Sequence, residues 1–150
     1  MSTEVIRRAV AADADAIAEL TRLAYTKWVP VIGRKPLPMQ VDYSVAVTLH
    51  RFDLLYCTTE LAGLIETVDE GGCLLIENVA VHPDFQGRGY GRRLLAHAEA
   101  LAAQAGIDRM RLYTNSKFEV NIALYRSLGY TVEREEPFNG GALTHMSKRL

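Results

Sequence analysis

Three glycines within five positions constrain this chain more than any other feature of its sequence. Gly87, Gly89 and Gly91 lie in the segment VAVHPDFQGRGYGRRLL, between an apolar run typical of a strand and a leucine-rich run typical of a helix. Glycine adopts left-handed backbone angles freely and lets a ligand approach the main chain closely. A bare turn that leads into a helix also gathers amides and partial positive charge, which together favour an anion, usually a phosphate.

Basic residues crowd the same helix start. Arg88, Arg92 and Arg93 stand where Asp and Glu are normally favoured, and a bound anion would offset that repulsion. The alternative is a tight structural turn followed by a solvated basic face. The Walker pattern requires Gly-Lys-Ser/Thr, which is absent here, and the dinucleotide pattern G-x-G-x-x-G has a different glycine spacing. The spacing that is present is Q-x-x-G-x-G, which begins at Gln86.

Hydrophobic periodicity predicts the elements on either side of this turn. The order is β-α-α-β-β-β-α-β-α-β-β, and the two strands on either side of the glycine turn and its helix are expected to pair in parallel. The segment 29–40 holds three prolines and a glycine, so it is expected to be irregular. Strands are expected at 4–10, 54–60, 61–68, 73–81, 108–114, 130–135 and 142–150, and helices at 13–28, 42–52, 94–105 and 116–128.

Local signals fix several of the helix ends. Asp13 is expected to cap the first helix, and Ser116 with Glu119 has the spacing of a capping box for the last one. Gly106 supplies a stop for the helix after the glycine turn. In the 42–52 helix, Val45, Leu49 and Phe52 are in phase and are expected to form its apolar face.

Composition limits the class of protein. The 150 residues suit one domain, 1–150, and 49% apolar against 23% charged residues is the balance of a soluble globule. A net charge of -1 gives no footprint for nucleic acid, and the sequence has no apolar segment of the length that a membrane helix needs. Cys57 and Cys73 each stand in an apolar run, which favours the reduced cytosol over a disulfide. A cytoplasmic protein is therefore expected.

Two segments resemble motifs of the GNAT superfamily, the acyl-CoA-dependent N-acyltransferases. The stretch around Gln86 resembles motif A of that family, and NIALYRSLGY, residues 121–130, resembles motif B. The order of the expected elements is also similar. The resemblance implies an α+β, or mixed α/β, fold of GNAT type: a mostly antiparallel mixed sheet of about seven strands, about four flanking helices, and a parallel strand pair at the coenzyme site.

The resemblance also implies an activity and a co-substrate. The chain is expected to move an acetyl group from acetyl-CoA to a primary amine of a small molecule or peptide, by direct attack in a ternary complex and without a metal. In this family the glycine-turn amides cradle the pyrophosphate of coenzyme A, and the preceding strand pairs with its pantetheine arm. The coenzyme-binding residues implied are Val79, Val81, Gln86, Gly87, Arg88, Gly89, Tyr90, Gly91, Arg92 and Asn121.

Tyr125 matches the tyrosine that in this family protonates the departing thiolate. A phenol with a pKa of about 10 can donate to a thiolate whose thiol has a pKa of about 8.5 when the two are held at hydrogen-bond distance. The alternative is an aromatic side chain that only packs between Ile122 and Leu128.

Glu77 is the candidate general base. It stands in CLLIENVAV, where both faces of the expected strand are apolar, so an unpaired carboxylate there would be costly. Either its pKa is raised at the edge of an active cleft, or a partner such as an arginine holds it. Some family members carry a glutamate on the next strand, where this chain has Tyr113, so a water chain is an alternative base. Glu66 and His145 are lesser candidates.

Tyr25, Trp28, the loop 29–40 and Tyr43 are expected to bind the acceptor, because the family gathers the amine between its first helices and its last strand pair. Their rings could stack on a cationic amine, although Trp28 is equally consistent with a core anchor. A non-enzymatic alternative is a sensor that binds acyl-CoA without turnover. The resemblance also allows a homodimer.

Overall fold

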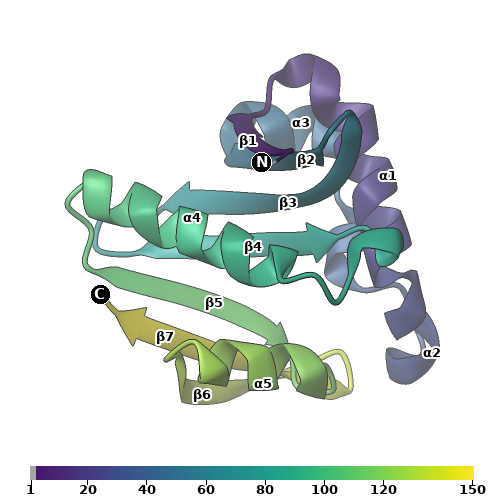
Figure 1. Cartoon of the computed structure of the whole chain (residues 1–150). Coiled ribbons are helices and arrows are strands. Elements are labelled where there is room, and N and C mark those ends of the chain that lie inside the picture. Colours follow the sequence, from purple (N-terminus) through teal and green to yellow (C-terminus); the bar gives the residue numbers. More distant parts are fainter. Residues whose placement is uncertain (1–2) are drawn as a thin grey trace.

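A computed structural model of the chain describes residues 3–150 as one seven-stranded sheet with helices on both faces (Figure 1). The strand order is β1-β2-β3-β4-β5-β7-β6, with β4 and β5 parallel and every other pair antiparallel. The expected mixed α/β fold, with seven strands and one parallel strand pair beside the glycine turn, is therefore confirmed. The strands are β1 Glu4–Arg8, β2 Arg51–Cys57, β3 Glu60–Asp69, β4 Leu74–Val81, β5 Arg109–Asn115, β6 Thr131–Phe138 and β7 Gly141–Arg149, and the helices are α1 Ala14–Tyr25, α2 Val29–Ile32, α3 Tyr43–Leu49, α4 Tyr90–Gln104 and α5 Glu119–Ser127.

The parallel strands separate along their length. Their pairing joins only Leu74–Ile76 to Met110–Leu112, although β4 continues to Val81 and β5 to Asn115. Figure 1 shows β4 and β5 diverging toward their C-terminal ends. The last residues of β4 are thus paired with β3 on one side and have no strand partner on the other.

Two hydrophobic clusters cover the two faces of the sheet. Alternating residues of β2 divide between them, with Leu54 packing toward α1 and α3 and Leu55 packing toward α4. In β3, Leu64 and Ile65 divide in the same way. Because helices cover both faces, the central strands are apolar on both sides, which explains their unbroken hydrophobic runs.

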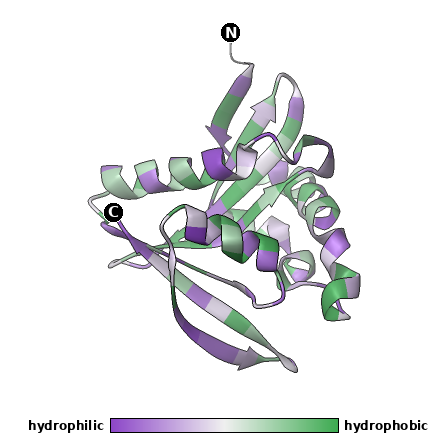
Figure 2. Cartoon of the chain, turned by 60° about the horizontal axis from the view of Figure 1, so that its bottom comes forward, coloured by the Kyte–Doolittle hydropathy of each residue, from purple (hydrophilic) through white to green (hydrophobic). Residues whose placement is uncertain are grey.

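The sheet edge at β6 is polar. Most of its residues are exposed, and Figure 2 shows the strand as predominantly hydrophilic. Charged side chains on an edge strand oppose pairing with another sheet. Within residues 3–150, no helix has the combined length and apolarity needed to cross a bilayer.

The expected 42–52 helix is wrong in its end and in its buried face. The helix α3 stops at Leu49, and Phe52 belongs to β2. Val45 is 50% and Leu49 is 72% exposed, whereas Tyr43 and Ala46 face the core. The residues from Arg51 onward pair with β3, so the contacts between strands outweigh the helical spacing of the apolar residues in this segment.

The expectation of an irregular 29–40 loop is also wrong in part. Val29–Ile32 forms a short helix, and Leu37–Gln40 forms a 3-10 turn. Proline is tolerated in the first turn of a helix, because its missing amide has no partner there in any case. Gly33, at φ 76°, ends the short helix in the left-handed region.

The two expected side-chain caps are not formed. Asp13 precedes α1, but its carboxylate accepts from the Val10 amide and from Arg7. The hydroxyl of Ser116 contacts that of Thr144, and α5 begins only at Glu119. The helix after the glycine turn, by contrast, ends at Gln104 shortly before Gly106, as predicted.

Candidate active site

The glycine turn forms a backbone cradle at the start of α4. Gly87 and Gly89 adopt φ 80° and 82°, in the left-handed region that favours glycine. The Gly89 carbonyl accepts the Arg93 amide at 3.0 Å, so the amides of 90–92 precede the helical ladder and have no partner within the helix. A cavity of about 350 Å³, the donor cavity, opens beside them. Amides without a helical partner and the positive helix end make its wall suited to an anion.

The end of β4 forms a second wall of the donor cavity. The His82 amide donates to the Ala62 carbonyl at 2.8 Å, just beyond the Gly63–Val81 pair. Antiparallel pairs alternate in their hydrogen bonding, so the amides of Val79 and Val81 point away from β3. They face the side on which β4 and β5 have separated.

Side chains hold the carbonyls on that same side of β4. Gln86 donates to the Val81 carbonyl at 3.1 Å, and the hydroxyl of Tyr25 lies 3.2 Å from the Val79 carbonyl. The sequence-predicted residues Val79, Val81 and Gln86 therefore lie together at one cavity, with the glycine turn. Their main-chain amides are placed as a strand-like ligand would require.

Tyr125 lies on α5 and lines the donor cavity, as does Asn121 from the same helix. Tyr125 is only 6% exposed, and burial raises the pKa of its phenol to about 12. Within residues 3–150 its hydroxyl has no hydrogen-bond partner, and its ring meets Tyr130 edge-on with the centroids 6.1 Å apart. The phenol is thus protonated at neutral pH, and its proton is not committed to another group of the protein.

Two predicted residues lie elsewhere than expected. The guanidinium of Arg88 stacks over the ring of Phe85 at 5.0 Å, and Arg88 is not among the residues that line the donor cavity. Trp28, expected to contact the acceptor, instead lines the donor cavity and stacks on Phe118 with the ring centroids 4.4 Å apart. Arg92 and Lys27 supply the positive side chains of this cavity.

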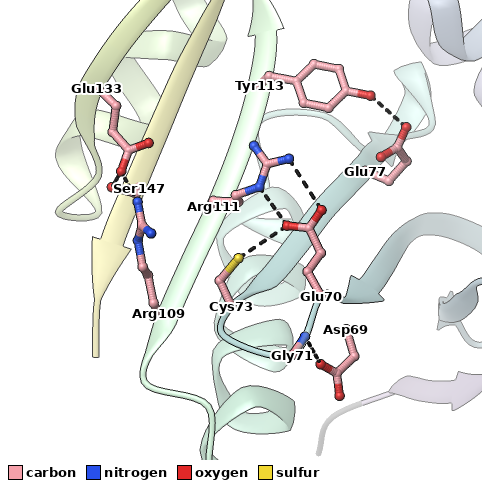
Figure 3. A network of polar contacts seen from close by, with 10 residues as sticks. All are labelled: Asp69, Glu70, Gly71, Cys73, Glu77, Arg109, Arg111, Tyr113, Glu133 and Ser147. Carbon is pink, nitrogen blue, oxygen red and sulfur yellow. Dashed lines mark hydrogen bonds and ion pairs between the residues drawn. The ribbon is translucent and has the colours of Figure 1, made fainter.

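A β-bulge places Glu77. Glu66 of β3 pairs with Asn78 and Thr67 pairs with Ile76, so Glu77 is the extra residue on β4. A bulge turns the side chains of its strand away from strict alternation. The Glu77 carboxylate accepts a hydrogen bond of 2.7 Å from the hydroxyl of Tyr113 on β5 (Figure 3). The partner of this carboxylate is therefore a tyrosine of the neighbouring strand.

Glu77 lines a second cavity of about 410 Å³, the acceptor cavity, together with Glu66. Glu66 is 3% exposed and contacts Nδ1 of His50 at 2.6 Å. Burial raises the pKa of the Glu66 carboxyl, and His50 opposes that rise. His145, the other lesser candidate, contacts Glu136 at 3.1 Å and lines neither cavity.

Tyr25 is shared by the two cavities. Its hydroxyl lies 2.9 Å from Oδ1 of Asn78 as well as near the Val79 carbonyl, and burial raises its pKa well above the usual range. Tyr43 lines the acceptor cavity and donates to the Pro38 carbonyl at 2.7 Å. The two cavities are thus adjacent and meet at a fixed tyrosine, with a phenol on one side and carboxylates on the other.

Comparison with known proteins identifies the family. The model of the Acetyltransferase (GNAT) family matches residues 16–130. The chain belongs to the GNAT acetyltransferase family. Among curated relatives, N-alpha-acetyltransferase 80 of Mus musculus is 37% identical over 84 residues, 56% of this chain and 25% of that protein. The ribosomal protein bS18-alanine N-acetyltransferase of Salmonella typhimurium is 43% identical over 53 residues, 35% of this chain and 36% of that protein.

The chain thus spans about a quarter of the length of the first relative and about a third of the length of the second. A solved structure of the same fold is the PaiA N-acetyltransferase of Thermoplasma acidophilum in complex with coenzyme A. It has a TM-score of 0.84 and 20% identity, with each chain covered in full.

Several residues that line these two cavities were missed in the sequence. Asn78, which contacts Tyr25, follows the bulge, and no local pattern announces a bulge. Phe118 and Phe138 line the acceptor cavity from segments that precede α5 and end β6. Arg34 lines it from the loop after α2. The sequence analysis expected the loop 29–40 as a whole to bind the acceptor, but it did not single out this arginine.

Proposed function

We propose that this GNAT chain transfers an acetyl group from acetyl-CoA to a primary amine by direct attack of the amine within a ternary complex. The observation that carries the proposal is the meeting of two unlike cavities at Tyr25. One combines a backbone anion cradle with a buried, protonated phenol, and the other contains two carboxylates. A thioester donor suits the first, and a cationic amine suits the second.

On the donor side, the chain binds through its main chain. The amides of 86–92 hold the pyrophosphate, with the charges of Arg92 and Lys27 beside them, and the amides of Val79 and Val81 hold the pantetheine arm as an added strand. Asn121 contacts the same arm from α5. Bound acetyl-CoA supplies an electrophilic thioester carbonyl and a thiolate leaving group.

Tyr125 is the general acid of the proposal. Its hydroxyl holds a proton at neutral pH because burial raises its pKa to about 12. It can deliver that proton to the sulfur as the carbon–sulfur bond breaks, and the second proton lost by the amine nitrogen then replaces it on the phenol. Because the phenol of Tyr125 is buried, water is also kept from competing for its proton.

Glu77 is the general base of the proposal. An amine is mostly ammonium at neutral pH and must lose a proton before it attacks, either directly to a carboxylate or through a water molecule. The hydrogen bond from Tyr113 fixes the Glu77 carboxylate toward the acceptor cavity while leaving its other oxygen to accept that proton. Tyr43 and Tyr25 shape the wall on which the amine rests.

The test is acetyl transfer from isotope-labelled acetyl-CoA to a panel of primary amines and peptides. Products should be detected by mass spectrometry, because the protein carries two free thiols, Cys57 and Cys73, and a thiol-release dye does not distinguish protein thiols from coenzyme A. Acetylation of any primary amine on nitrogen supports the proposal. Tight binding of acetyl-CoA with no turnover across the panel would contradict it and favour a sensor.

A further inference from the structure

The acceptor cavity has an apolar wall built from four parts of the chain. Side chains from α2, from the loop that follows it, from the turn before α5 and from the end of β6 contribute to it. The wall consists of Ile32, Leu37, Pro38, Val41, Phe118 and Phe138. Such a surface gains free energy by covering hydrocarbon, so a fully hydrophilic acceptor would leave it unused.

The charges of the same cavity are unbalanced toward the negative. Glu66 and Glu77 contribute two carboxylates, whereas Arg34 is the one permanently cationic side chain among the lining residues. His50 also faces the cavity, and its Nδ1 is engaged by Glu66 at 2.6 Å. One positive charge on the acceptor therefore complements the site, and a second would lack a partner.

A hydrogen bond ties together the two segments that flank the apolar wall. Nη1 of Arg34 donates to the Asn139 carbonyl at 3.0 Å, and this joins the loop after α2 to the turn between β6 and β7. Two apolar residues of the cavity are close in sequence to the two ends of this bridge: Leu37 follows Arg34 by three residues, and Phe138 directly precedes Asn139. An extended polypeptide requires an open path between such segments, whereas a small molecule fits a cavity of about 410 Å³.

We infer that the acceptor of this chain is a small primary amine with a single positive charge and an apolar body, of the arylalkylamine class, and not a polypeptide. The inference rests on the proposed acetyl transfer. The ammonium group faces Glu66 and Glu77, and the apolar body packs against Leu37, Phe118 and Phe138.

The bonds and protons of the step balance. A nitrogen–carbon bond forms and the carbon–sulfur bond of the thioester breaks, so one ammonium and one thioester become one amide, one thiol and one released proton. The proton accepted by Glu77 passes to solvent, and the second proton lost by nitrogen replaces the one that Tyr125 gives to sulfur. No oxidant, reductant or metal enters this balance.

The test compares kcat/KM for four probes with the full chain and acetyl-CoA. They are 2-phenylethylamine, ethylamine, the doubly charged 1,4-diaminobutane, and a short peptide with a free N-terminus and one lysine. The expected result is at least about 100-fold preference for 2-phenylethylamine over ethylamine, because even one missing methylene in an apolar pocket reduces kcat/KM about 10-fold or more. The diamine and the peptide are expected to be poorer still.

A variant tests the apolar wall directly. Phe138→Ala should lower kcat/KM for 2-phenylethylamine about 10-fold and leave that for ethylamine within about 2-fold. Phe138→Leu should restore most of the loss. Val132 lies on the same strand but outside the cavity, so the control variant Val132→Ala should change neither kcat/KM value. Acetyl-CoA affinity, measured by calorimetry, shows that each variant is folded.

The outcomes separate this inference from the proposed function. Acetylation of the peptide or the diamine in preference to 2-phenylethylamine would overturn the inference and leave amine acetylation standing. Equal use of ethylamine and 2-phenylethylamine, or equal loss for both in Phe138→Ala, would also overturn it. Binding of acetyl-CoA with no acetylation of any probe or of a broader amine panel would instead overturn the proposed function itself.

Discussion

The donor and acceptor cavities lie side by side but are built in different ways. The donor cavity presents main-chain amides of one contiguous stretch, from Val79 to Arg92, together with two positive side chains. The acceptor cavity presents side chains from α2, the β4 bulge, β5 and the β6–β7 hairpin, and it contains the two carboxylates. A main-chain site depends on backbone shape and tolerates few changes. A side-chain site can change its ligand without altering the fold, which allows one donor to serve many acceptors.

The largest effect is expected from breaking the backbone of the donor side. Gly89→Val should weaken acetyl-CoA binding more than about 100-fold, because a branched side chain at φ 82° is strained and the helix start must shift. An added Cβ at Gly89 meets no atom within 4 Å, so conformation and not a clash causes the loss. Calorimetry measures the affinity, and circular dichroism checks the fold.

Gly106→Val is the matched control for that change. Gly106 has a similar φ of 74° and equally open surroundings, but it lies beyond the other end of α4. It should lower the melting temperature to a similar extent while leaving acetyl-CoA affinity unchanged. Equal affinity losses in both variants would mean that the glycine turn is not the coenzyme cradle.

Next in size is the effect of removing the acid. Tyr125→Phe should lower kcat by about 10 to 1000-fold, the range of general-acid contributions, and change acetyl-CoA affinity little. Tyr130→Phe is the control, because Tyr130 also buries a hydroxyl without a partner and touches Tyr125, yet it lines neither cavity. Steady-state kinetics should show its kcat within about 2-fold of the parent. Unchanged turnover in Tyr125→Phe would remove this tyrosine from the mechanism.

The acceptor side is tested through its base. A general base acts as the carboxylate, so the pH profile of kcat for the parent should have an acidic limb. Glu77→Gln should lose this acidic limb and about 100-fold in kcat. Glu70→Gln removes a carboxylate that pairs with Arg111 outside both cavities and should keep the limb (Figure 3). A lower melting temperature in Glu77→Gln, with the pH profile intact, would assign Glu77 a structural role.

The same division explains what the sequence could predict. The strand, glycine turn and helix are contiguous, so their pattern alone predicted the parallel pair and a backbone anion site. Tyr125 was predicted through a motif that also lies in one segment. Phe52 was assigned to a helix because its pairing with β3 is a long-range effect. The contact of Tyr113 with Glu77 depends on a bulge and on the register of two strands, and neither leaves a local signal.

The smallest effect concerns the charge buried on the acceptor side, and it appears in stability. Burial raises the pKa of Glu66, so its ionisation is easier in the unfolded chain, and the folded state loses stability as pH rises above the ordinary glutamate pKa of 4.5. Arg111 lowers the pKa of Glu70, so that group contributes stability above 4.5 that is lost as pH falls. Urea unfolding of the ligand-free protein across pH should therefore give opposite trends. The stability of the parent minus that of Glu66→Gln should decrease with rising pH, and the corresponding difference for Glu70→Gln should increase. If the difference for Glu66→Gln instead increases with pH, as that for Glu70→Gln does, His50 compensates the buried charge of Glu66 in full. The acceptor cavity would then hold no excess of negative charge at this carboxylate.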